Sequence, residues 1–185
     1  VHDNRSTGLY LTPFSQGGHI LKKYHARKQA MEYAMFFGGD PMHNIIASSG
    51  AALGTSEADV VGGIRGEPVQ LVKCKTVDLE VPATSEIVLE GVVEVDTSLW
   101  KEEGRFGEYP GYYTSVWSEP RPVFKVKCIT HRKEPILQCQ TPGMYIHEPI
   151  PHMSLVSSAQ VWNRLEASGI EGITGVYIEP AQPAV

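Results

Sequence analysis

The chain has 185 residues and a formal net charge of −5 at pH 7; 42% of the residues are hydrophobic and 20% are charged. This size and composition are those of a globular protein with one substantial core or two small ones. The acidic balance argues against a general nucleic-acid binder, and the apolar runs are too short to cross a bilayer, so we expect neither nucleic acid nor a membrane as a partner.

The N-terminal part of the chain is predicted to alternate strands and helices. Glycine and proline punctuate the apolar segments, and apolar residues that recur every three or four positions after Gly18 indicate a helix. The predicted elements are a strand over residues 8–12, a helix over about 19–37 that Gly38 and Gly39 end, a strand over 45–47, and a brief helix that Thr55 or Ser56 caps and that Gly62 and Gly63 interrupt.

The remainder of the chain is mostly β. Alternation over residues 86–96 places Ile87 and Leu89 on one side of a strand and Glu90 on the other. The predicted elements are strands over 69–74 and 86–96, a hairpin of 122–131 with 136–138, a helix over 154–167 and a strand over 173–178. Because strands dominate the middle and helices flank them, we predict a single α+β domain over residues 1–185, built on an antiparallel sheet or barrel.

The three cysteines lack the spacing of a metal site or a redox motif. Cys74 and Cys128 fall in predicted strands, where core packing is their expected role, and Cys139 follows the predicted hairpin. An odd number of cysteines without a Cys-x-x-Cys pair favours a reduced, cytoplasmic protein.

The stretch from Lys101 to Tyr113 carries the densest chemistry in the chain: three carboxylates, three glycines and four aromatic rings. Carboxylates beside aromatic rings can lose water and gain proton affinity, and glycines let the backbone approach a ligand closely. Glu103 and Glu108 are therefore candidates for general acid–base catalysis. The alternative is a solvated glycine turn between two strands.

Two further groups of residues are candidates for binding an anion and a cation. Ser48 and Ser49 precede a predicted helix, so their hydroxyls and the free N–H groups at the positive end of that helix could cradle a phosphate. His19 and Glu57 offer the imidazole nitrogen and carboxylate oxygen that suit a divalent cation such as Mn²⁺, which would need further ligands. The alternatives are small residues before a helix, a helix-start histidine with an ordinary hydrogen bond, and a carboxylate placed against a helix dipole.

Four sequence blocks occur in the order and spacing that UbiD-like decarboxylases have, and the chain resembles that family. The blocks are Gly39-Asp40-Pro41, Leu71-Val72-Lys73-Cys74, Val81-Pro82-Ala83-Thr84-Ser85-Glu86-Ile87-Val88-Leu89-Glu90-Gly91, and Glu103-Gly104-Arg105-Phe106-Gly107-Glu108 with the following Gly111-Tyr112. The resemblance extends from about Val1 to Pro180, and it is highly specific because four separate blocks agree in order.

The resemblance implies a fold, a cofactor and a reaction. UbiD-like enzymes bind prenylated FMN in a split β-barrel that resembles the barrel of flavin reductases, and they add or remove CO₂ at an unsaturated or aromatic carbon. The chain is therefore expected to serve a lyase, a decarboxylase or carboxylase whose small-molecule substrate is an aromatic or α,β-unsaturated acid together with CO₂. The resemblance implies Mn²⁺ and K⁺ at the cofactor phosphate. This agrees with the high cost of burying a dianion without cations.

The resemblance also implies roles for single residues. His19 and Glu57 take the places of the family's metal-binding histidine and glutamate at the cofactor, and Ser48 and Ser49 match its serine pair near the cofactor phosphate and the K⁺ site.

The two remaining candidates belong to the family's acid–base network. Glu108 corresponds to the glutamate that exchanges a proton for CO₂, and Glu103 corresponds to the first glutamate of the catalytic network. Phe106 and Tyr109 flank Glu108 in the sequence, and these aromatic neighbours are expected to raise its affinity for a proton.

This chain departs from the family pattern in three places. The family usually has a proline where this chain has Arg105, which changes the charge and stiffness of the loop. The family's Asn-x-Gly-x-Tyr-Arg element, which supplies a metal ligand and the catalytic arginine, would lie just before Val1, and a region that mediates much of the dimer contact would follow Pro180. We therefore expect this chain to be the cofactor-binding middle of a larger, homo-oligomeric decarboxylase.

Two other functions fit the same residues. A catalytically silent cofactor-binding subunit, completed by other chains, would bind the cofactor without turnover. A plain flavin-binding oxidoreductase with a similar barrel would bind ordinary FMN and oxidise NAD(P)H, but the sequence shows no nicotinamide-binding fingerprint.

Overall fold

The computed structural model organises the chain into two compact units. The described residues are 1–49, 54–105, 107, 113, 119–139 and 149–179. The first unit comprises Val1–Gly39, Gln70–Phe106 and Thr114–Gln138, and the second comprises Asp40–Val69, Gly107–Tyr113 and Cys139–Val185. That residues 1–185 act as a single domain stays a prediction.

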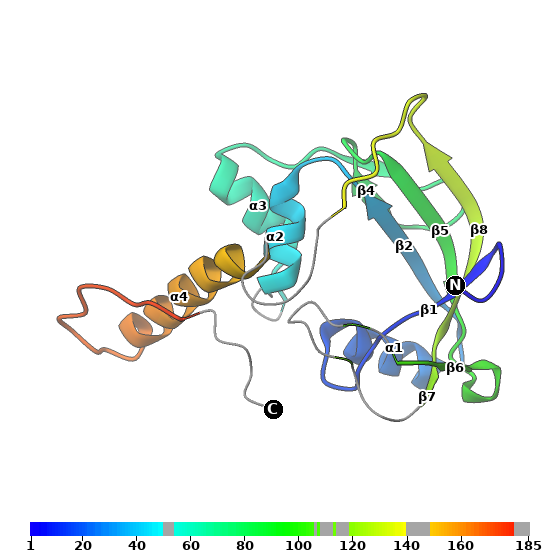
Figure 1. Cartoon of the computed structure of the whole chain (residues 1–185), viewed down its shortest axis with the longest axis horizontal. Coiled ribbons are helices and arrows are strands. Elements are labelled where there is room, and N and C mark those ends of the chain that lie inside the picture. The colour runs from blue at the N-terminus through cyan, green and yellow to red at the C-terminus, as the bar shows by residue number, and fades with distance from the viewer. Residues whose placement is uncertain (50–53, 106, 108–112, 114–118, 140–148, 180–185) are drawn as a thin grey trace. The chain divides into compact units, whose positions relative to one another are not determined.

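A four-stranded antiparallel sheet forms the centre of the first unit (Figure 1). Its strands, in spatial order, are β1 (Ser6–Gly8), β8 (Val123–His131), β5 (Ile87–Val93) and β2 (Met31–Phe37). Two further antiparallel pairs are β3 (Leu71–Lys73) with β4 (Glu80–Pro82), and β6 (Lys101–Glu103) with β7 (Glu119–Arg121). The predicted α+β class with antiparallel sheets is confirmed, and over the described residues the four-stranded sheet keeps two edges and closes into no barrel.

The long helix predicted over 19–37 is wrong in its second half. The helix α1 (Gln16–Arg27) ends at Lys28, which takes the left-handed conformation with φ of 54°, and β2 begins at Met31. All seven residues of β2 pair with β5. The apolar residues of 31–37 suit a helix or a strand, and pairing with a distant segment decides for the strand. No glycine marks the end of α1 in the sequence, since Lys28 takes the left-handed conformation that a glycine usually adopts at a helix end.

The apolar run 45–47 is helical, so the strand predicted there is wrong. It lies inside α2 (Pro41–Ser49), which begins the second unit. Oδ1 of Asp40 accepts a hydrogen bond from the N–H of Met42 at 2.9 Å. Pro41 occupies the first helical position, where its missing N–H removes no intrahelical bond. The Asp-Pro pair is the local start signal, since three apolar residues cannot distinguish a strand from a helix.

The helix predicted after Thr55 is confirmed as α3 (Glu57–Arg65). Ser56 is its N-cap, and Gly66 ends it in the left-handed conformation. The predicted interruption at the glycine pair is wrong, because the helix runs through both glycines. At Gly62 a Cβ would lie 3.2 Å from a backbone carbonyl oxygen, so this buried glycine permits close packing of the following turn.

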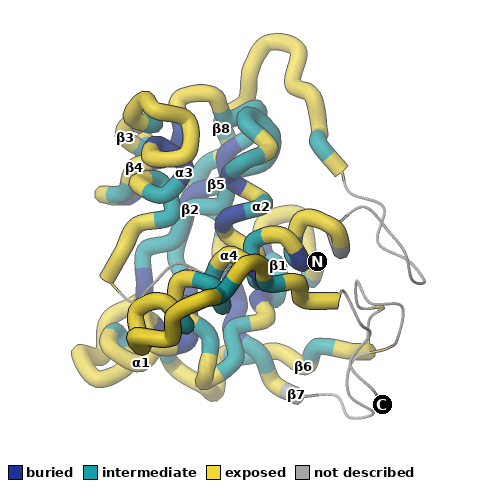
Figure 2. The backbone as a smooth tube through the Cα atoms, turned by 90° about the vertical axis from the view of Figure 1, so that its left-hand side faces the viewer, coloured by how far each residue is buried: buried dark blue, intermediate teal, exposed yellow. Residues whose placement is uncertain are grey.

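The strands predicted over 86–96 and 122–131 are confirmed as β5 and β8, and they carry the core. Val93 and Phe124 are fully buried, each with 0% exposure. The buried apolar cluster comprises Leu9, Leu21, Met31, Val93 and Phe124. Leu21 belongs to α1, so this helix packs on the sheet through its apolar face. In Figure 2, β2 and β5 are drawn mostly in teal and dark blue, whereas much of α1 is yellow.

The strand predicted over 136–138 is an irregular segment in the structure. The chain leaves β8 at Arg132, whose N–H donates to the carbonyl oxygen of Glu86 at 3.0 Å. The N–H of Ile136 then donates to the carboxylate of Glu86 at 3.2 Å. Glu86 therefore accepts two hydrogen bonds from this stretch of backbone, and no hairpin with β8 forms among the described residues.

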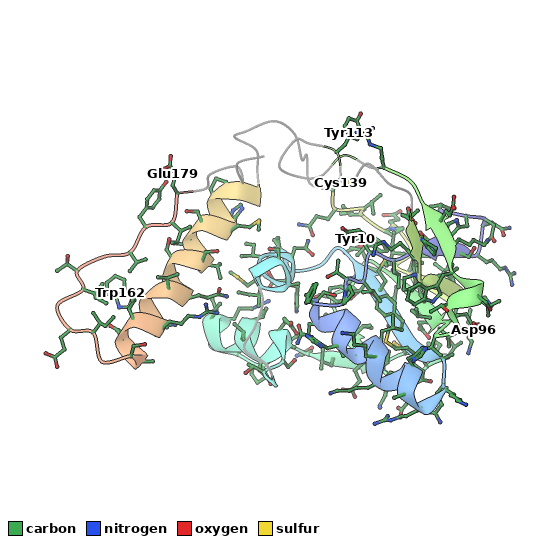
Figure 3. All side chains as sticks on the ribbon, turned by 90° about the horizontal axis from the view of Figure 1, so that it is seen from below. Tyr10, Asp96, Tyr113, Cys139, Trp162 and Glu179 are labelled. Carbon is green, nitrogen blue, oxygen red and sulfur yellow. The ribbon has the colours of Figure 1, made fainter. Side chains whose placement is uncertain are left out.

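The last helix, α4 (Pro149–Ala167), begins earlier than predicted, and the segment after it returns alongside it (Figures 1 and 3). Residues 173–178, predicted as a strand, have no strand partner in the described part of the chain. The N–H of Ile178 donates to the hydroxyl of Ser158 at 2.8 Å, so a helix side chain replaces the partner. None of the described helices combines the length and hydropathy that a bilayer span requires.

Glu90, in the middle of β5, is a carboxylate with only 1% exposure. Its Oε2 accepts hydrogen bonds from the N–H of Lys75 (2.8 Å), the N–H of Thr76 (2.7 Å) and the hydroxyl of Thr76 (2.9 Å). Burial acts to raise the pKa of this carboxyl, but the three hydrogen bonds outweigh burial and hold the pKa below its ordinary value. Glu90 therefore ties the turn between β3 and β4 to the central strand.

We predict that Glu90→Gln lowers the free energy of unfolding of the first unit by about 2 kcal/mol at pH 7, because an amide oxygen is a weaker acceptor than a carboxylate. Since the folded-state pKa is lowered, the stabilisation is present above the ordinary pKa of 4.5 and is lost as pH falls through the folded pKa. The difference between parent and variant therefore shrinks in acid.

Native-state hydrogen exchange at the β5 amides of the full-length protein measures this difference. Glu80→Gln, which changes an exposed carboxylate on β4, is the matched control and should alter exchange little. Equal protection of β5 in the parent and in Glu90→Gln at pH 7 would contradict the role given to Glu90.

Gly91 lies where the register between β5 and β8 shifts, and a Cβ there would be 1.9 Å from the carbonyl oxygen of Lys125. We predict that Gly91→Ala lowers the free energy of unfolding by about 3 kcal/mol, because the two strands must separate to admit the methyl group. Gly104→Ala is the control, since a Cβ at that position meets nothing within 4 Å. Hydrogen exchange at β5 and β8 compares them, and protection equal to that of the control would refute the close approach.

Candidate active site

Glu103, a predicted acid–base residue, ends strand β6 in the first unit. Its Oε2 is buried and has no hydrogen-bond partner among the residues that the structure describes. The carboxylate lies against Gly8 of β1, where a Cβ would be 1.9 Å from this oxygen, so a glycine is needed to leave room for it. Because nearly all buried polar groups in proteins have partners, an unpartnered carboxylate oxygen marks a candidate functional group.

A second buried polar atom, Nε2 of His2, lies at the same place, 3.4 Å from the Cβ position of Gly8, and it too has no partner within the described ranges. A turn fixes the main chain of His2, whose N–H donates to the carbonyl of Ser6 at 2.9 Å. The carboxylate of Asp3 closes this turn by accepting from the hydroxyl of Ser6 (2.7 Å) and the N–H of Arg5 (2.8 Å), and these two hydrogen bonds lower the pKa of Asp3. Sequence reasoning missed His2, because no local pattern signals its encounter with so distant a carboxylate.

His19, a predicted metal and cofactor ligand, lies in the first turn of α1 and is exposed. Ser15 caps this helix: its hydroxyl accepts from the N–H of Gly18 at 3.1 Å, and its carbonyl accepts from the N–H of His19 at 3.0 Å. A Cβ on Gly18 would lie 1.9 Å from the carbonyl oxygen of Thr12, so the glycine lets the loop and the helix start approach each other. The exposed imidazole is thus carried on a tightly held helix start.

The second unit carries Ser48, Ser49 and Glu57 on α2 and α3, two helices that pack together (Figure 1). The serine pair ends α2, so it follows a helix and not the predicted strand. The hydroxyl of Ser48 is exposed and donates to the carbonyl of Ile45 at 2.9 Å. Glu57 is the first residue of α3 and is partly buried, and it shares the first turn with Asp59. Both carboxylates lie favourably at the positive end of the helix dipole.

An ion-pair network joins the two helices that carry these residues. The guanidinium of Arg65, in the last turn of α3, pairs with the carboxylate of Asp40, which precedes α2, and with that of Glu67 at 2.6 Å. The pKa of Asp40 is lowered, first by the hydrogen bond from the N–H of Met42 and then by the charge of Arg65. The start of α2 is thereby tied to the end of α3, the two helices that carry the serine pair and Glu57.

Glu108, the predicted proton donor, lies outside the described residues, as do the neighbouring Phe106 and Tyr109. The described residues on either side of this stretch, Gly107 and Tyr113, form an isolated antiparallel bridge.

Within the described ranges, no three histidine, cysteine, aspartate or glutamate side chains gather as a metal site. His19 belongs to the first unit and Glu57 to the second. The chemistry that the first unit offers is a sheltered carboxylate beside an imidazole, at Glu103 and His2, whereas the second offers the exposed hydroxyl of Ser48 and a helix-start carboxylate. The roles of the site residues stay predictions.

The family comparison covers most of the chain. A family model for UbiD, described as the 3-octaprenyl-4-hydroxybenzoate carboxy-lyase Rift-related domain, matches residues 1–145. Ferulic acid decarboxylase 1 of Saccharomyces cerevisiae is 40% identical over 151 residues, which is 80% of this chain and 29% of that protein. Pyrrole-2-carboxylic acid decarboxylase of Pseudomonas aeruginosa is 34% identical over 160 residues, which is 85% of this chain and 31% of that protein. The chain therefore spans less than a third of the length of these relatives.

The structural comparison agrees. An evolved dimeric form of the UbiD-class enzyme HmfF from Pelotomaculum thermopropionicum, in complex with prFMN, matches with a TM-score of 0.84 and 29% identity. The match covers 97% of this chain and 40% of that chain.

Proposed function

This chain belongs to the UbiD family of carboxy-lyases, and on that premise we propose that the protein containing it is a prenylated-FMN-dependent decarboxylase that also catalyses the reverse carboxylation. The observation that carries the proposal is the likeness of nearly the whole chain to a prFMN-bound enzyme, with a TM-score of 0.84. An aromatic or α,β-unsaturated carboxylic acid is the proposed substrate class. The names of the two decarboxylase relatives, which act on ferulic acid and pyrrole-2-carboxylic acid, support that class.

The proposed cofactor site uses the four residues that the family resemblance assigns to the metals and the cofactor phosphate. His19 and Glu57 would hold Mn²⁺, and Ser48 and Ser49 would lie at the cofactor phosphate and a K⁺ ion. The donors fit this use, since an exposed imidazole and a partly buried carboxylate are ligands that Mn²⁺ accepts. Phosphate oxygens and residues outside this chain would complete the coordination. The cations offset the cost of removing a dianionic phosphate from water.

In the proposed reaction, the bond between the substrate carbon and its carboxylate breaks, CO₂ leaves, and a proton takes its place. When bound, prenylated FMN supplies the electron sink that makes this bond cleavage possible. Glu108, in its acid form, delivers the proton to the carbon, and in the reverse direction its carboxylate takes that proton back. Glu103, sheltered against Gly8, tunes Glu108 through hydrogen bonding and charge.

We propose the family's split β-barrel for the cofactor-binding region and a homo-oligomer for the full-length enzyme. The antiparallel sheet order β1-β8-β5-β2 supports the first proposal, because its open edges can be joined by further strands. The HmfF structure, described as dimeric, supports the second.

We predict that Glu108→Gln in the full-length enzyme lowers the rate of decarboxylation about 10²- to 10⁴-fold, because glutamine cannot supply the proton. The measurement is CO₂ release together with exchange of labelled CO₂ into the substrate. Glu102→Gln, which alters an exposed carboxylate on β6, is the control and should keep most activity. An active Glu108→Gln enzyme would remove Glu108 from the mechanism, whereas cofactor binding without turnover in every reconstitution of the parent would favour a catalytically silent subunit.

We predict that His19→Ala lowers the amounts of Mn²⁺ and cofactor that co-purify with the full-length enzyme, because the metal loses its imidazole ligand. Elemental analysis and the absorption spectrum of the extracted flavin measure both. His25→Ala, an exposed histidine on the same helix, is the matched control and should retain metal and cofactor. Equal retention in the two variants would show that His19 is not a ligand.

A further inference from the structure

Two unpartnered polar atoms meet beside Gly8. Nε2 of His2 and Oε2 of Glu103 are both buried, both have no hydrogen-bond partner in the described part of the chain, and both lie within 3.4 Å of the Cβ position of this glycine. No direct hydrogen bond joins the two atoms. Burial removes the hydration of each atom at a considerable cost, so native proteins rarely leave two such groups close together without a mediator.

A water molecule is the mediator that suits this pair. An imidazole N–H donates and a carboxylate oxygen accepts, so one water can accept from the first and donate to the second. Buried waters in proteins commonly bind polar groups that have no other partner. We propose that a buried water bridges His2 Nε2 and Glu103 Oε2, and that His2 is thereby a positioning residue for Glu103.

The main chains on both sides of this bridge are held by hydrogen bonds. The turn closed by Asp3 and Ser6 fixes His2, while the pairing of β6 with β7 fixes Glu103. A carboxylate anchored through one oxygen keeps a single orientation, which presents its second oxygen to the acid–base network. Without the bridge, the carboxylate can rotate away. The catalytic consequence rests on the proposed function, whereas the bridge itself does not.

The catalytic test compares His2→Phe with His2→Gln in the full-length enzyme loaded with prenylated FMN. Phenylalanine keeps the ring and removes the hydrogen bond, whereas the side-chain amide of glutamine can donate a hydrogen bond in place of Nε2. We expect His2→Phe to lower kcat about tenfold with little change in KM, because one hydrogen bond to a charged group is lost. We expect His2→Gln to keep most of the parent kcat. The melting temperature and the bound cofactor serve as controls for folding.

A high-resolution crystal structure of the full-length protein tests the bridge without reference to activity. We expect density for one water between the two atoms in the parent, and a reoriented Glu103 without that water in His2→Phe. Other partners for Nε2 or Oε2, and no water, would overturn the bridge. Parent-like kcat in His2→Phe, or equal losses in both variants, would overturn the positioning role.

A parent without decarboxylase activity would refute the proposed function. The electron density between His2 and Glu103 would then show by itself whether the water bridge exists.

Discussion

The antiparallel pairing of β5 with both β2 and β8 is the constraint on which the first unit depends. The register shift at Gly91 brings the two backbones so close that a methyl group has no room. The positions of the candidate residues in this unit follow from these three strands. β8 aligns β1 and with it Gly8, the chain before β2 forms the helix that carries His19, and the chain after β5 leads to Glu103.

Two glutamates in this unit, fully buried Glu90 and partly buried Glu103, show how one residue type takes two roles. Oε2 of Glu90 accepts three hydrogen bonds, which stabilise its charge and hold the turn between β3 and β4 against β5. Oε2 of Glu103 accepts none among the described residues and lies beside the equally unpartnered His2. A satisfied buried carboxylate serves structure, whereas an unsatisfied one remains available to a water, a substrate or a proton. Of these two glutamates, Glu103 is the one whose buried oxygen can still accept a hydrogen bond.

In the second unit, polar contacts join the ends of two helices. Asp40 begins α2 and pairs with Arg65 at the end of α3, so two short helices are tied at their termini. This arrangement places Ser48 and Ser49 at the end of one helix and Glu57 at the start of the next. The residues proposed for the phosphate and for one cation ligand therefore belong to the facing termini of these two helices in the sequence.

The sequence by itself determined the features that are encoded locally: the capped start of α3 at Ser56, the alternating strands β5 and β8, and the ordered motifs that place the chain in its family. It did not determine whether 31–37 is helix or strand, because that choice rests on pairing with a segment far along the chain. Only the tertiary structure brought His2 to Glu103, since their approach depends on β1 and β6 and on the missing side chain of Gly8. Local propensity acts between neighbours, whereas burial and strand pairing act between distant residues.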